Sequence, residues 1–261
     1  MSKKSFKKYC HKHVDAVISL LKKPNEALTV ADFHHLRVEI KKIRALIVML
    51  NFSVKTFNSK KISKPIEKIF NQAGKVRMLQ LEAAMIKKHD PKRQLKTYSR
   101  MLHEKEIQEK KIFSVIHAEV KSTLKKNFRK IIQVTHKIHE GQIIKYVSRK
   151  KNEIITLTAQ ETLKTSQIHK LRKRLKRLYY NLKSLDQKDN IQTFKNCEAL
   201  LDLMGKWHDS RVMNRHLMET ADKHFIASSE IEHVLQIAGK LYSKSQILFR
   251  EINKEKRKKI V

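Results

Sequence analysis

Glycine and proline are scarce in this chain of 261 residues, which contains four Gly and three Pro. No stretch shows sustained alternation of apolar and polar residues with many β-branched side chains, so β-strands are not expected. Long segments instead repeat apolar residues at the three- and four-residue spacing of an amphipathic helix. The sequence therefore predicts an all-α protein in which one helix follows another with little between them.

Cysteines and long apolar runs are also few. Cys10 and Cys197 are too few for the disulfide framework of a small secreted protein, and neither belongs to a CxxC motif. The apolar run Val14–Leu21 is interrupted by Asp15 and lacks the small-residue cleavage site of a signal peptide. The longest apolar run, Ala45–Leu50, is far shorter than the ~20 residues that cross a bilayer. We therefore expect a soluble protein of the reducing cytoplasm.

Proline and N-cap residues indicate the expected helix boundaries in the first part of the chain. A first helix is expected over about residues 5–23, ending before Pro24. Thr29 is a typical N-cap residue for a second helix. Pro65 is expected to open a third helix, and Asp90-Pro91 to close it.

The later part of the chain predicts further helices. Residues 92–139 are rich in Lys and Glu and predict either one very long helix or two, followed by a break at Gly141. A turn is expected at residues 186–190 and a frayed basic tail at residues 254–261. The remaining helices are expected at about residues 141–158, 165–185, 191–224 and 229–254.

Positive charge dominates the composition. There are 59 Lys and Arg against 25 Asp and Glu, which gives a formal net charge of +34. Such a field attracts nearly any polyanion, so the partner is expected to be negatively charged. Because 40% of the residues are hydrophobic, the chain can bury a sizeable core and is not a disordered basic tail.

A histidine followed by cations at positions i+3 and i+7 occurs twice. In the first copy, Arg37 and Lys41 follow His34. The second copy consists of His169, Arg172 and Lys176. Residues at this spacing share one face of an α-helix, so each copy predicts a positive stripe.

The first stripe lies beside the predicted core face of its helix. That face is formed by apolar residues at helical spacing, namely Phe33, Leu36, Ile40, Ile43, Ile47 and Leu50. Glu39 and Lys42 are expected to be exposed on the far side. Two interpretations of the stripe stay open: it lines a groove between helices, or the lysine stems lie along apolar surface with their charged ends in water.

The duplication extends beyond the histidine segments. Ala73–Arg77 resembles Met204–Asp209, and each lies one helix after its histidine. His34 and His169 are 135 residues apart and Gly74 and Gly205 are 131 apart, so order and spacing both repeat. We expect one domain over residues 1–261 with two related halves, at about 5–139 and 141–254. A glycine within a helix costs roughly 1 kcal/mol relative to alanine, and close helix packing is the preferred explanation for both glycines.

These repeated segments, HHLRVEIKKIR and HKLRKRLKRLY, each followed by its glycine segment, resemble the CHAD family, the conserved histidine α-helical domain. The resemblance covers essentially the whole chain. It implies two helical bundles related by a pseudo-twofold axis around a basic central cavity that binds inorganic polyphosphate. It also implies a binding module that is not an enzyme, found at polyphosphate granules or beside polyphosphate-metabolising enzymes. We expect no cofactor and no metal.

The resemblance also implies which residues face the anion. Two departures from the repeated pattern are Tyr179, which stands where the first copy has Arg44, and Met78, which stands where the second copy has Asp209. The first removes a cation and the second an acid. The implied polyphosphate-binding residues are His34, Arg37, Lys41, Arg44, Lys75, Arg77, His169, Arg172, Lys176 and Arg177.

Physical chemistry agrees with a polyphosphate ligand. A flexible chain of phosphates requires many donors along a channel, and Arg and Lys supply bidentate contacts and mobile point charges. For His34 and His169, phosphate contact, a structural hydrogen bond and metal ligation all stay open. We expect His11, His13 and His35 to lie at the surface.

Three other functions remain to be weighed. A field of this size would also hold DNA or RNA nonspecifically, but aromatic residues make up 7% of the chain and no base-reading module is apparent. The pair His208-Asp209 could belong to a metal-dependent HD-type phosphohydrolase, which would need further ligands. A helical scaffold whose charge serves solubility is the third alternative.

Overall fold

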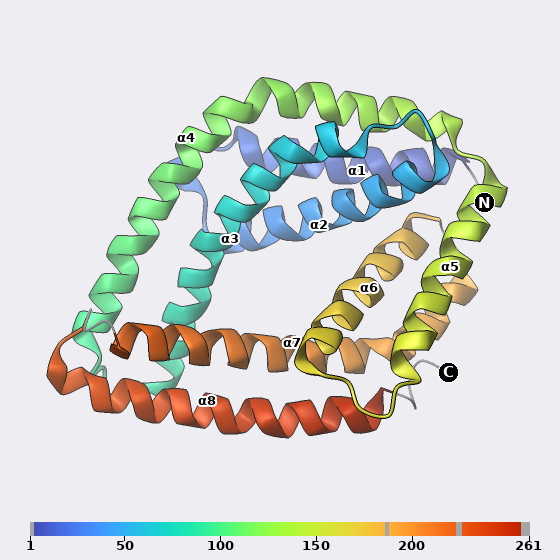
Figure 1. The fold of residues 1–261 in the computed structure, drawn as a ribbon. Coiled ribbons are helices and arrows are strands. Elements are labelled where there is room, and N and C mark those ends of the chain that lie inside the picture. The colour runs from blue at the N-terminus through green and yellow to red at the C-terminus, as the bar shows by residue number, and fades with distance from the viewer. Residues whose placement is uncertain (1–2, 186–187, 223–225, 257–261) are drawn as a thin grey trace. The chain divides into compact units, whose positions relative to one another are not determined.

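A computed structural model describes residues 3–185, 188–222 and 226–256 of the chain. Within these residues there are helices and no strand, so the all-α prediction is confirmed (Figure 1). Two short 3₁₀ helices, η1 (Asn25–Ala27) and η2 (Thr135–Lys137), join longer helices. The α-helices are α1 (Lys3–Lys22), α2 (Val30–Ser53), α3 (Ser59–His89), α4 (Lys96–Val134), α5 (Glu140–Thr158), α6 (Thr165–Ser184), α7 (Lys188–Asp222) and α8 (Ser228–Glu255).

The chain folds into two compact units, and each is assembled from separate segments. Helices α1 and α2 belong to unit 1 and α8 belongs to unit 2, whereas α3 to α7 each contribute a segment to both. The predicted pseudo-twofold relation of the two sequence halves around a central cavity stays a prediction. Unit 1 comprises Met1–Arg77, Glu109–Thr156 and Lys173–Lys195, and unit 2 comprises Met78–Gln108, Leu157–Arg172 and Asn196–Val261.

Capping side chains explain where the early helices begin. The Thr29 hydroxyl accepts the backbone N–H of Asp32, and the Asp32 carboxylate accepts the N–H of Thr29, so the predicted N-cap of α2 is part of a full capping box. The prediction that Pro65 opens α3 is wrong. The Asn58 side chain accepts the backbone N–H of Lys61, and this local cap starts the helix at Ser59.

Later boundaries follow the sequence in part. Helix α3 ends at His89 as predicted, and the Asp90 carboxylate accepts the N–H groups of Gln94 and Leu95 just before α4. The charged segment forms one long helix, α4, of 39 residues. Of the predicted turn at 186–190, residues 186–187 lie outside the described residues and residues 188–190 belong to α7. Of the predicted tail, Lys254 belongs to α8 and residues 257–261 lie outside the described residues.

Unit 1 is a bundle of antiparallel helix pairs. Helices α3 and α4 are antiparallel. The Asn127 amide of α4 donates to the Ile62 carbonyl near the start of α3, and the Gln72 amide, further along α3, donates to the Glu109 carbonyl, which lies earlier in α4. The Asn181 amide of α6 donates to the Tyr146 hydroxyl of α5 at 2.8 Å. Such hydrogen bonds satisfy buried polar groups between helices and fix the register of the pairs.

Glu39 and His13 contradict their predicted exposure. Glu39 is 3% exposed and His13 is 4% exposed, and the His13 ring hydrogen-bonds the Glu39 carboxylate. Lys42 is half-buried and donates to the other oxygen of Glu39 at 2.6 Å. His35 is exposed as predicted, and His11 is half-buried. The prediction that Glu39 is exposed failed for a physical reason. A buried carboxylate is tolerated where hydrogen bonds and opposite charges compensate for its lost hydration.

Unit 2 surrounds a separate apolar core. Its helices are tied together by buried acids: Glu230 accepts the backbone N–H groups of Thr97 and Tyr98 at the start of α4, and Glu82 accepts the Tyr98 hydroxyl. No helix within the described residues is long and apolar enough to cross a membrane. The core consists of Ile86, Leu95, Tyr98, Leu102, Met213, Leu217, Ala221, Ile226, Val234, Ile237, Ala238 and Leu241.

Candidate functional site

Cations of α2 and α3 gather in unit 1. His34, Arg37, Lys41 and Arg44 lie on α2, and Arg77 lies on α3. The positive charges of Arg77, Lys41 and Arg37 all act on the His34 ring, and those of Arg44 and Arg77 act on the Arg37 guanidinium. We call these five residues the unit 1 cation cluster.

Arg37 is the anchor of the unit 1 cation cluster. Its Nη1 donates to the Phe70 carbonyl oxygen at 2.7 Å, and its guanidinium lies 4.3 Å from the centre of the Phe70 ring. The Arg44 guanidinium lies over the same ring at 4.7 Å. Burial, and then the charges of Arg44 and Arg77, lower the pKa of Arg37 to about 10. No carboxylate among the described residues lies within salt-bridge distance of Arg37, so an added anion would relieve repulsion between cations.

Gly74 on α3 makes room for Arg37. A Cβ atom at this position would collide with the Arg37 guanidinium. Close packing at Gly74 is therefore present, but the packed group is a side chain and not a helix backbone. The same explanation is wrong for Gly205, where an added Cβ would meet no atom within 4 Å.

Histidine 34 sits at the edge of the unit 1 cation cluster. The residue is exposed, yet partial desolvation and then the charges of Arg77, Lys41, His35 and Arg37 lower its pKa. In the absence of an anion the ring is therefore neutral at pH 7. It can donate one hydrogen bond in this state and can take up a proton when negative charge approaches.

Two cations of unit 1 lie near glutamates. The ammonium of exposed Lys75 lies 3.7 Å from a carboxylate oxygen of Glu109, and the guanidinium of half-buried Arg44 lies 3.7 Å from one of Glu67. Pairs at such distances near the surface are worth about 0–1 kcal/mol, so another anion can replace the glutamate. On α6, Lys176 is half-buried and Arg177 is exposed.

Helix α6 divides the second predicted stripe between the two units. Lys176 and Arg177 belong to unit 1, whereas His169 and Arg172 belong to unit 2. The charge of Arg177 opposes the burial that raises the pKa of Tyr146 to about 12. The second copy therefore contributes cations to both units.

His169 lines a cleft in unit 2 with a volume of about 600 Å³. Its ring lies 5.1 Å from the ring of His208, measured between centroids. Among the described residues that line the cleft, none is Asp or Glu. We call it the unit 2 cleft; its lining residues are Thr165, Ser166 and His169 of α6, Trp207, His208, Arg211, Val212, Asn214 and Arg215 of α7, and Tyr242, Ser245, Gln246 and Phe249 of α8.

Sequence analysis missed the α7 cations of the unit 2 cleft. His208, Arg211 and Arg215 have the same i, i+3, i+7 spacing as the two predicted stripes, so the signal was present in the sequence. The Arg211 guanidinium lies 5.2 Å from the centre of the Trp207 ring, which restrains it beside the cleft. A third histidine-cation stripe therefore lies next to His169.

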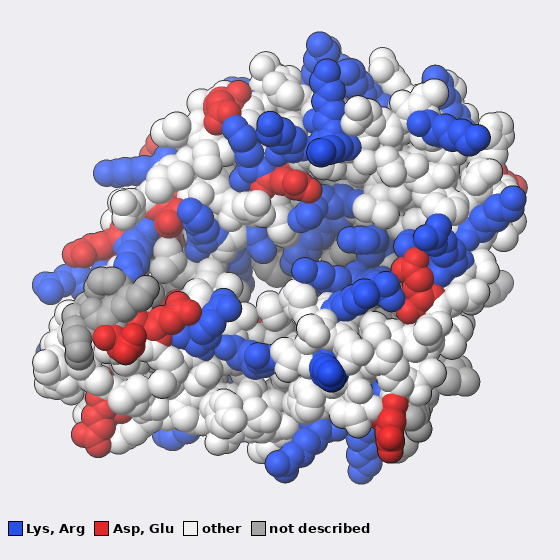
Figure 2. Space-filling view, viewed as in Figure 1, with Lys and Arg blue, Asp and Glu red and all other residues white. Residues whose placement is uncertain are grey.

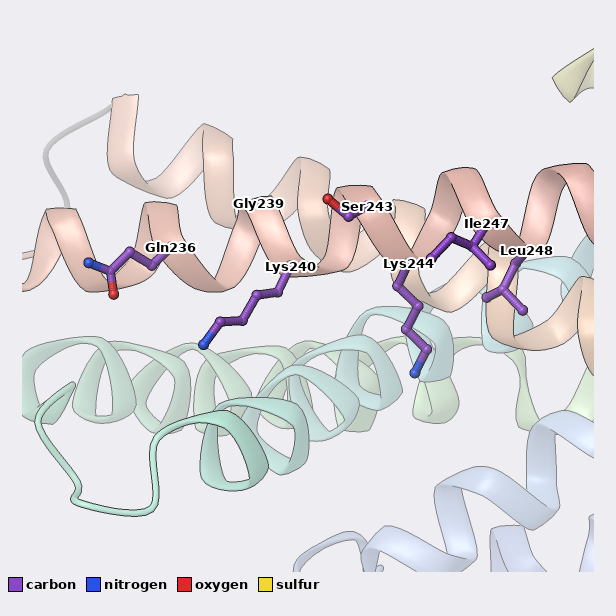
Figure 3. A pocket seen from close by; sticks show the side chains of 7 residues that line it. All are labelled: Gln236, Gly239, Lys240, Ser243, Lys244, Ile247 and Leu248. Atoms are coloured by element: carbon purple, nitrogen blue, oxygen red, sulfur yellow. The ribbon is translucent and has the colours of Figure 1, made fainter.

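A second groove of unit 2 runs along α8 (Figure 3). Lys240 and Lys244 extend from the helix beside Gly239, and Ile247 and Leu248 supply apolar surface. Burial and the charges of Lys88, Lys244 and Lys240 lower the pKa of the half-buried His89 ring.

Positive charge is widespread on the molecule. Figure 2 shows Lys and Arg side chains far outnumbering Asp and Glu on one face.

The described residues include no group of three or more His, Cys, Asp or Glu side chains placed to hold a metal ion. Both cysteines are buried, and burial raises the pKa of each thiol, to about 12 for Cys10. The nucleophilic thiolate form is therefore disfavoured at both positions.

The sequence was compared with models of known protein families. The family model for the CHAD domain matches residues 12–218. The chain belongs to the CHAD family. No curated protein matches the chain. The matched residues include every predicted anion-facing residue and all the α6 and α7 walls of the unit 2 cleft, whereas α8 lies beyond the match.

Proposed function

We propose that this CHAD protein binds inorganic polyphosphate through its histidine-cation stripes and acts as a binding or localising module without catalysis of its own. The unit 1 cation cluster supports the proposal most directly. There Arg37 and Arg44 are held over one Phe70 ring while Arg77 adds a third positive charge. Cations kept together at an energetic cost favour a ligand that neutralises several of them at once.

Polyphosphate suits this arrangement better than a single phosphate. It carries regularly spaced negative charge and has no base edges to be read, so a row of Arg and Lys donors is sufficient for recognition. The unit 2 cleft, with His169, Arg211 and Arg215 in its lining, provides a further set of donors. A cytoplasmic location, at polyphosphate granules or beside polyphosphate-metabolising enzymes, is part of the proposal.

Binding to long-chain polyphosphate, measured at several salt concentrations, tests the proposal. The test variant replaces Arg37, Lys41, Arg172 and Lys176 with alanine. We expect an affinity loss of about a hundredfold or more, since each hydrogen bond to a charged group contributes about 1.5–3 kcal/mol. We also expect a shallower dependence of affinity on salt, because fewer counterions are released on binding.

A matched control removes four positive charges from other positions, all of them in unit 1. Its four lysines are exposed on α1 and α4, and they are Lys7, Lys8, Lys125 and Lys126. We expect a loss of less than about fivefold for this control, because exposed charges act weakly through solvent. Equal losses in the two variants would instead indicate diffuse attraction to the surface.

Competition between polyphosphate and duplex DNA at one salt concentration tests the nearest alternative. The proposal predicts that polyphosphate displaces DNA at equal phosphate concentration. A clear preference for DNA would contradict it. Incubation with polyphosphate and Mg²⁺ or Mn²⁺ tests the absence of catalysis, and release of orthophosphate that is lost in Asp209→Ala would overturn that part of the proposal.

A further inference from the structure

The unit 2 cleft has two walls of different chemistry. One wall, from α6 and α7, carries His169, His208, Arg211 and Arg215. The other wall, from α8, carries Tyr242, Ser245, Gln246 and Phe249. Residues at 242, 245, 246 and 249 recur at three- and four-residue spacing, so they share one face of α8. A phosphate chain can use the polar groups of the second wall, but it gains little from the aromatic rings of Tyr242 and Phe249, which carry no charge.

The α8 wall can hold a flat ring. Tyr242 is 56% exposed, so it is available to a ligand, and half-buried Phe249 lies about two turns further along the same face. Aromatic side chains bind nucleobases by stacking, and this contact tolerates any base. The exposed Gln246 amide, which lies between these aromatic residues in sequence, has both donors and an acceptor for the edge of a base.

The cationic wall can hold a short phosphate chain. Arg211 and Arg215 supply planar donors, and the two histidines can each donate or take up a proton. Thr165 and Ser166, the first two residues of α6, add hydroxyl donors at a helix N-terminus, where the helix dipole also favours an anion. The described residues that line the cleft include no Asp or Glu.

The cleft has the size and rigidity of a small-molecule site. Its volume of about 600 Å³ falls within the range of about 300–1,000 Å³ found for such sites. The Asn214 amide of α7 donates to the Ala238 carbonyl of α8 at 2.9 Å, which ties the two walls together. The Ser245 hydroxyl donates to the Tyr242 carbonyl, so it stabilises the α8 turn that carries the exposed ring.

We propose that the unit 2 cleft binds a nucleoside polyphosphate, with its phosphates on the α6–α7 wall and its base on the α8 wall. The inference goes beyond polyphosphate binding, because it depends on residues of α8 that lie outside the CHAD match. It assigns the aromatic face of the cleft to the base and its cationic face to the phosphates.

Calorimetric titration of the full-length protein with ATP, inorganic tripolyphosphate and adenosine tests the inference. We expect ATP to bind about tenfold more tightly than tripolyphosphate, because a stacked base adds affinity that phosphates cannot supply. Adenosine should bind far more weakly than ATP. Equal affinities for ATP and tripolyphosphate would overturn the inference.

Substitutions at Tyr242 test whether its ring causes the preference for ATP over tripolyphosphate. Tyr242→Ala should remove the preference for ATP, whereas Tyr242→Phe should keep it because the ring remains. Ser243→Ala, on the next position of α8 and not in the cleft lining, is the matched control and should bind ATP like the unaltered protein. A preference for ATP that survives Tyr242→Ala would overturn the assignment of the α8 wall.

Binding of long-chain polyphosphate to the unaltered protein is measured in the same buffer. Equal affinities for ATP and tripolyphosphate, with polyphosphate binding intact, would overturn the nucleotide inference alone. An intact preference for ATP, with no polyphosphate binding, would overturn the proposed function alone. The two ideas therefore fail separately.

Discussion

The side chain of Arg37 occupies the space beside Gly74 that any larger residue would need. The Arg37 guanidinium reaches the Phe70 carbonyl one turn earlier on α3, and a Cβ atom at position 74 would collide with it. Gly74 lies at the middle of a helix, where glycine costs roughly 1 kcal/mol relative to alanine. The local helix preference is thus overridden by the placement of a cation.

Substitution of Gly74 separates stability from binding. In Gly74→Ala the Arg37 guanidinium must move away from Phe70, so we expect weaker polyphosphate binding, by about tenfold, as one positioned donor is lost. The free energy of unfolding should change by less than about 1 kcal/mol, because the gain in helix propensity offsets the lost hydrogen bond. Urea unfolding and a binding titration measure the two effects.

Gly205→Ala is the matched control for this substitution, since an added Cβ there meets open space. It should stabilise the protein by up to about 1 kcal/mol and leave the Arg37 contacts intact. In an Arg37→Ala background, Gly74→Ala should likewise become stabilising. Strong destabilisation by Gly74→Ala in that background would contradict the steric explanation.

Glu39 makes stability depend on pH. Burial would raise the pKa of its carboxyl, but hydrogen bonds from His13 and Lys42 outweigh this effect and hold the pKa at about 2. A carboxyl with a lowered pKa stabilises the folded state fully above its unfolded pKa of 4.5 and loses this contribution as pH falls toward 2. Its contribution at pH 7 is roughly 3 kcal/mol.

Glu39→Gln should therefore destabilise the protein more at pH 7 than at pH 3, by roughly 2 kcal/mol in the free energy of unfolding. Urea unfolding at the two pH values measures the difference. Glu67→Gln, at an exposed position of α3, is the control and should give nearly the same small effect at both. A cost of Glu39→Gln that does not depend on pH would show that packing alone determines it.

Local signals were sufficient to predict most of the helices. Thr29 marked the start of α2, and Pro91 followed the end of α3 as expected. Pro65 misled because the prediction placed it at the first residue of α3, whereas it lies inside the helix, which begins at Ser59 after the Asn58 cap. The burial of Glu39 could not be predicted, because it depends on His13, 26 residues earlier in the sequence.

The candidate sites were likewise predictable from the sequence only in part. The stripes of α2 and α6 follow from one-dimensional spacing, and so does the missed stripe of Arg211 and Arg215 on α7. The α8 wall of the unit 2 cleft does not, because an exposed Tyr242 has no meaning until helix packing places it opposite cations. The spacing likewise gave no indication that α6 would divide its stripe between two compact units.

Polyphosphate binding should strengthen as pH falls, partly through His34. Partial desolvation and neighbouring cations lower the pKa of this ring, so it is neutral in the free protein at pH 7. Bound phosphate raises that pKa, and binding takes up a proton. Affinity should thus increase between pH 8 and pH 6, by about fivefold from this residue, since charges about 4 Å apart in water interact by about 1 kcal/mol.

His34→Gln tests this contribution, because glutamine keeps a donor but cannot be protonated. Titrations with long-chain polyphosphate at pH 6 and pH 8 should show a smaller pH effect in His34→Gln than in the unaltered protein. His103→Gln, at an exposed position of α4, serves as the control and should keep the full effect. An unchanged pH effect in His34→Gln would exclude His34 as the proton acceptor.

Arg211 and Arg215 should contribute to polyphosphate binding although they lie outside the two predicted stripes. Both line the unit 2 cleft, and Arg211 is held over the Trp207 ring, so its guanidinium is already positioned and loses little freedom on binding. The double variant Arg211→Ala, Arg215→Ala should bind long-chain polyphosphate at least about tenfold more weakly, and its affinity should depend less on salt.

The control for this double variant must remove charge from the same helix without reaching the cleft. Lys206 is exposed on α7, pairs with Asp202 at 2.7 Å, and is not among the residues lining the cleft. Lys206→Ala should change the affinity by less than about threefold, because an exposed i, i+4 pair is worth only a few tenths of a kcal/mol. If Lys206→Ala weakened binding as much as the loss of Arg211 and Arg215, long-range attraction to α7 would account for the affinity, and the third stripe would have no specific role.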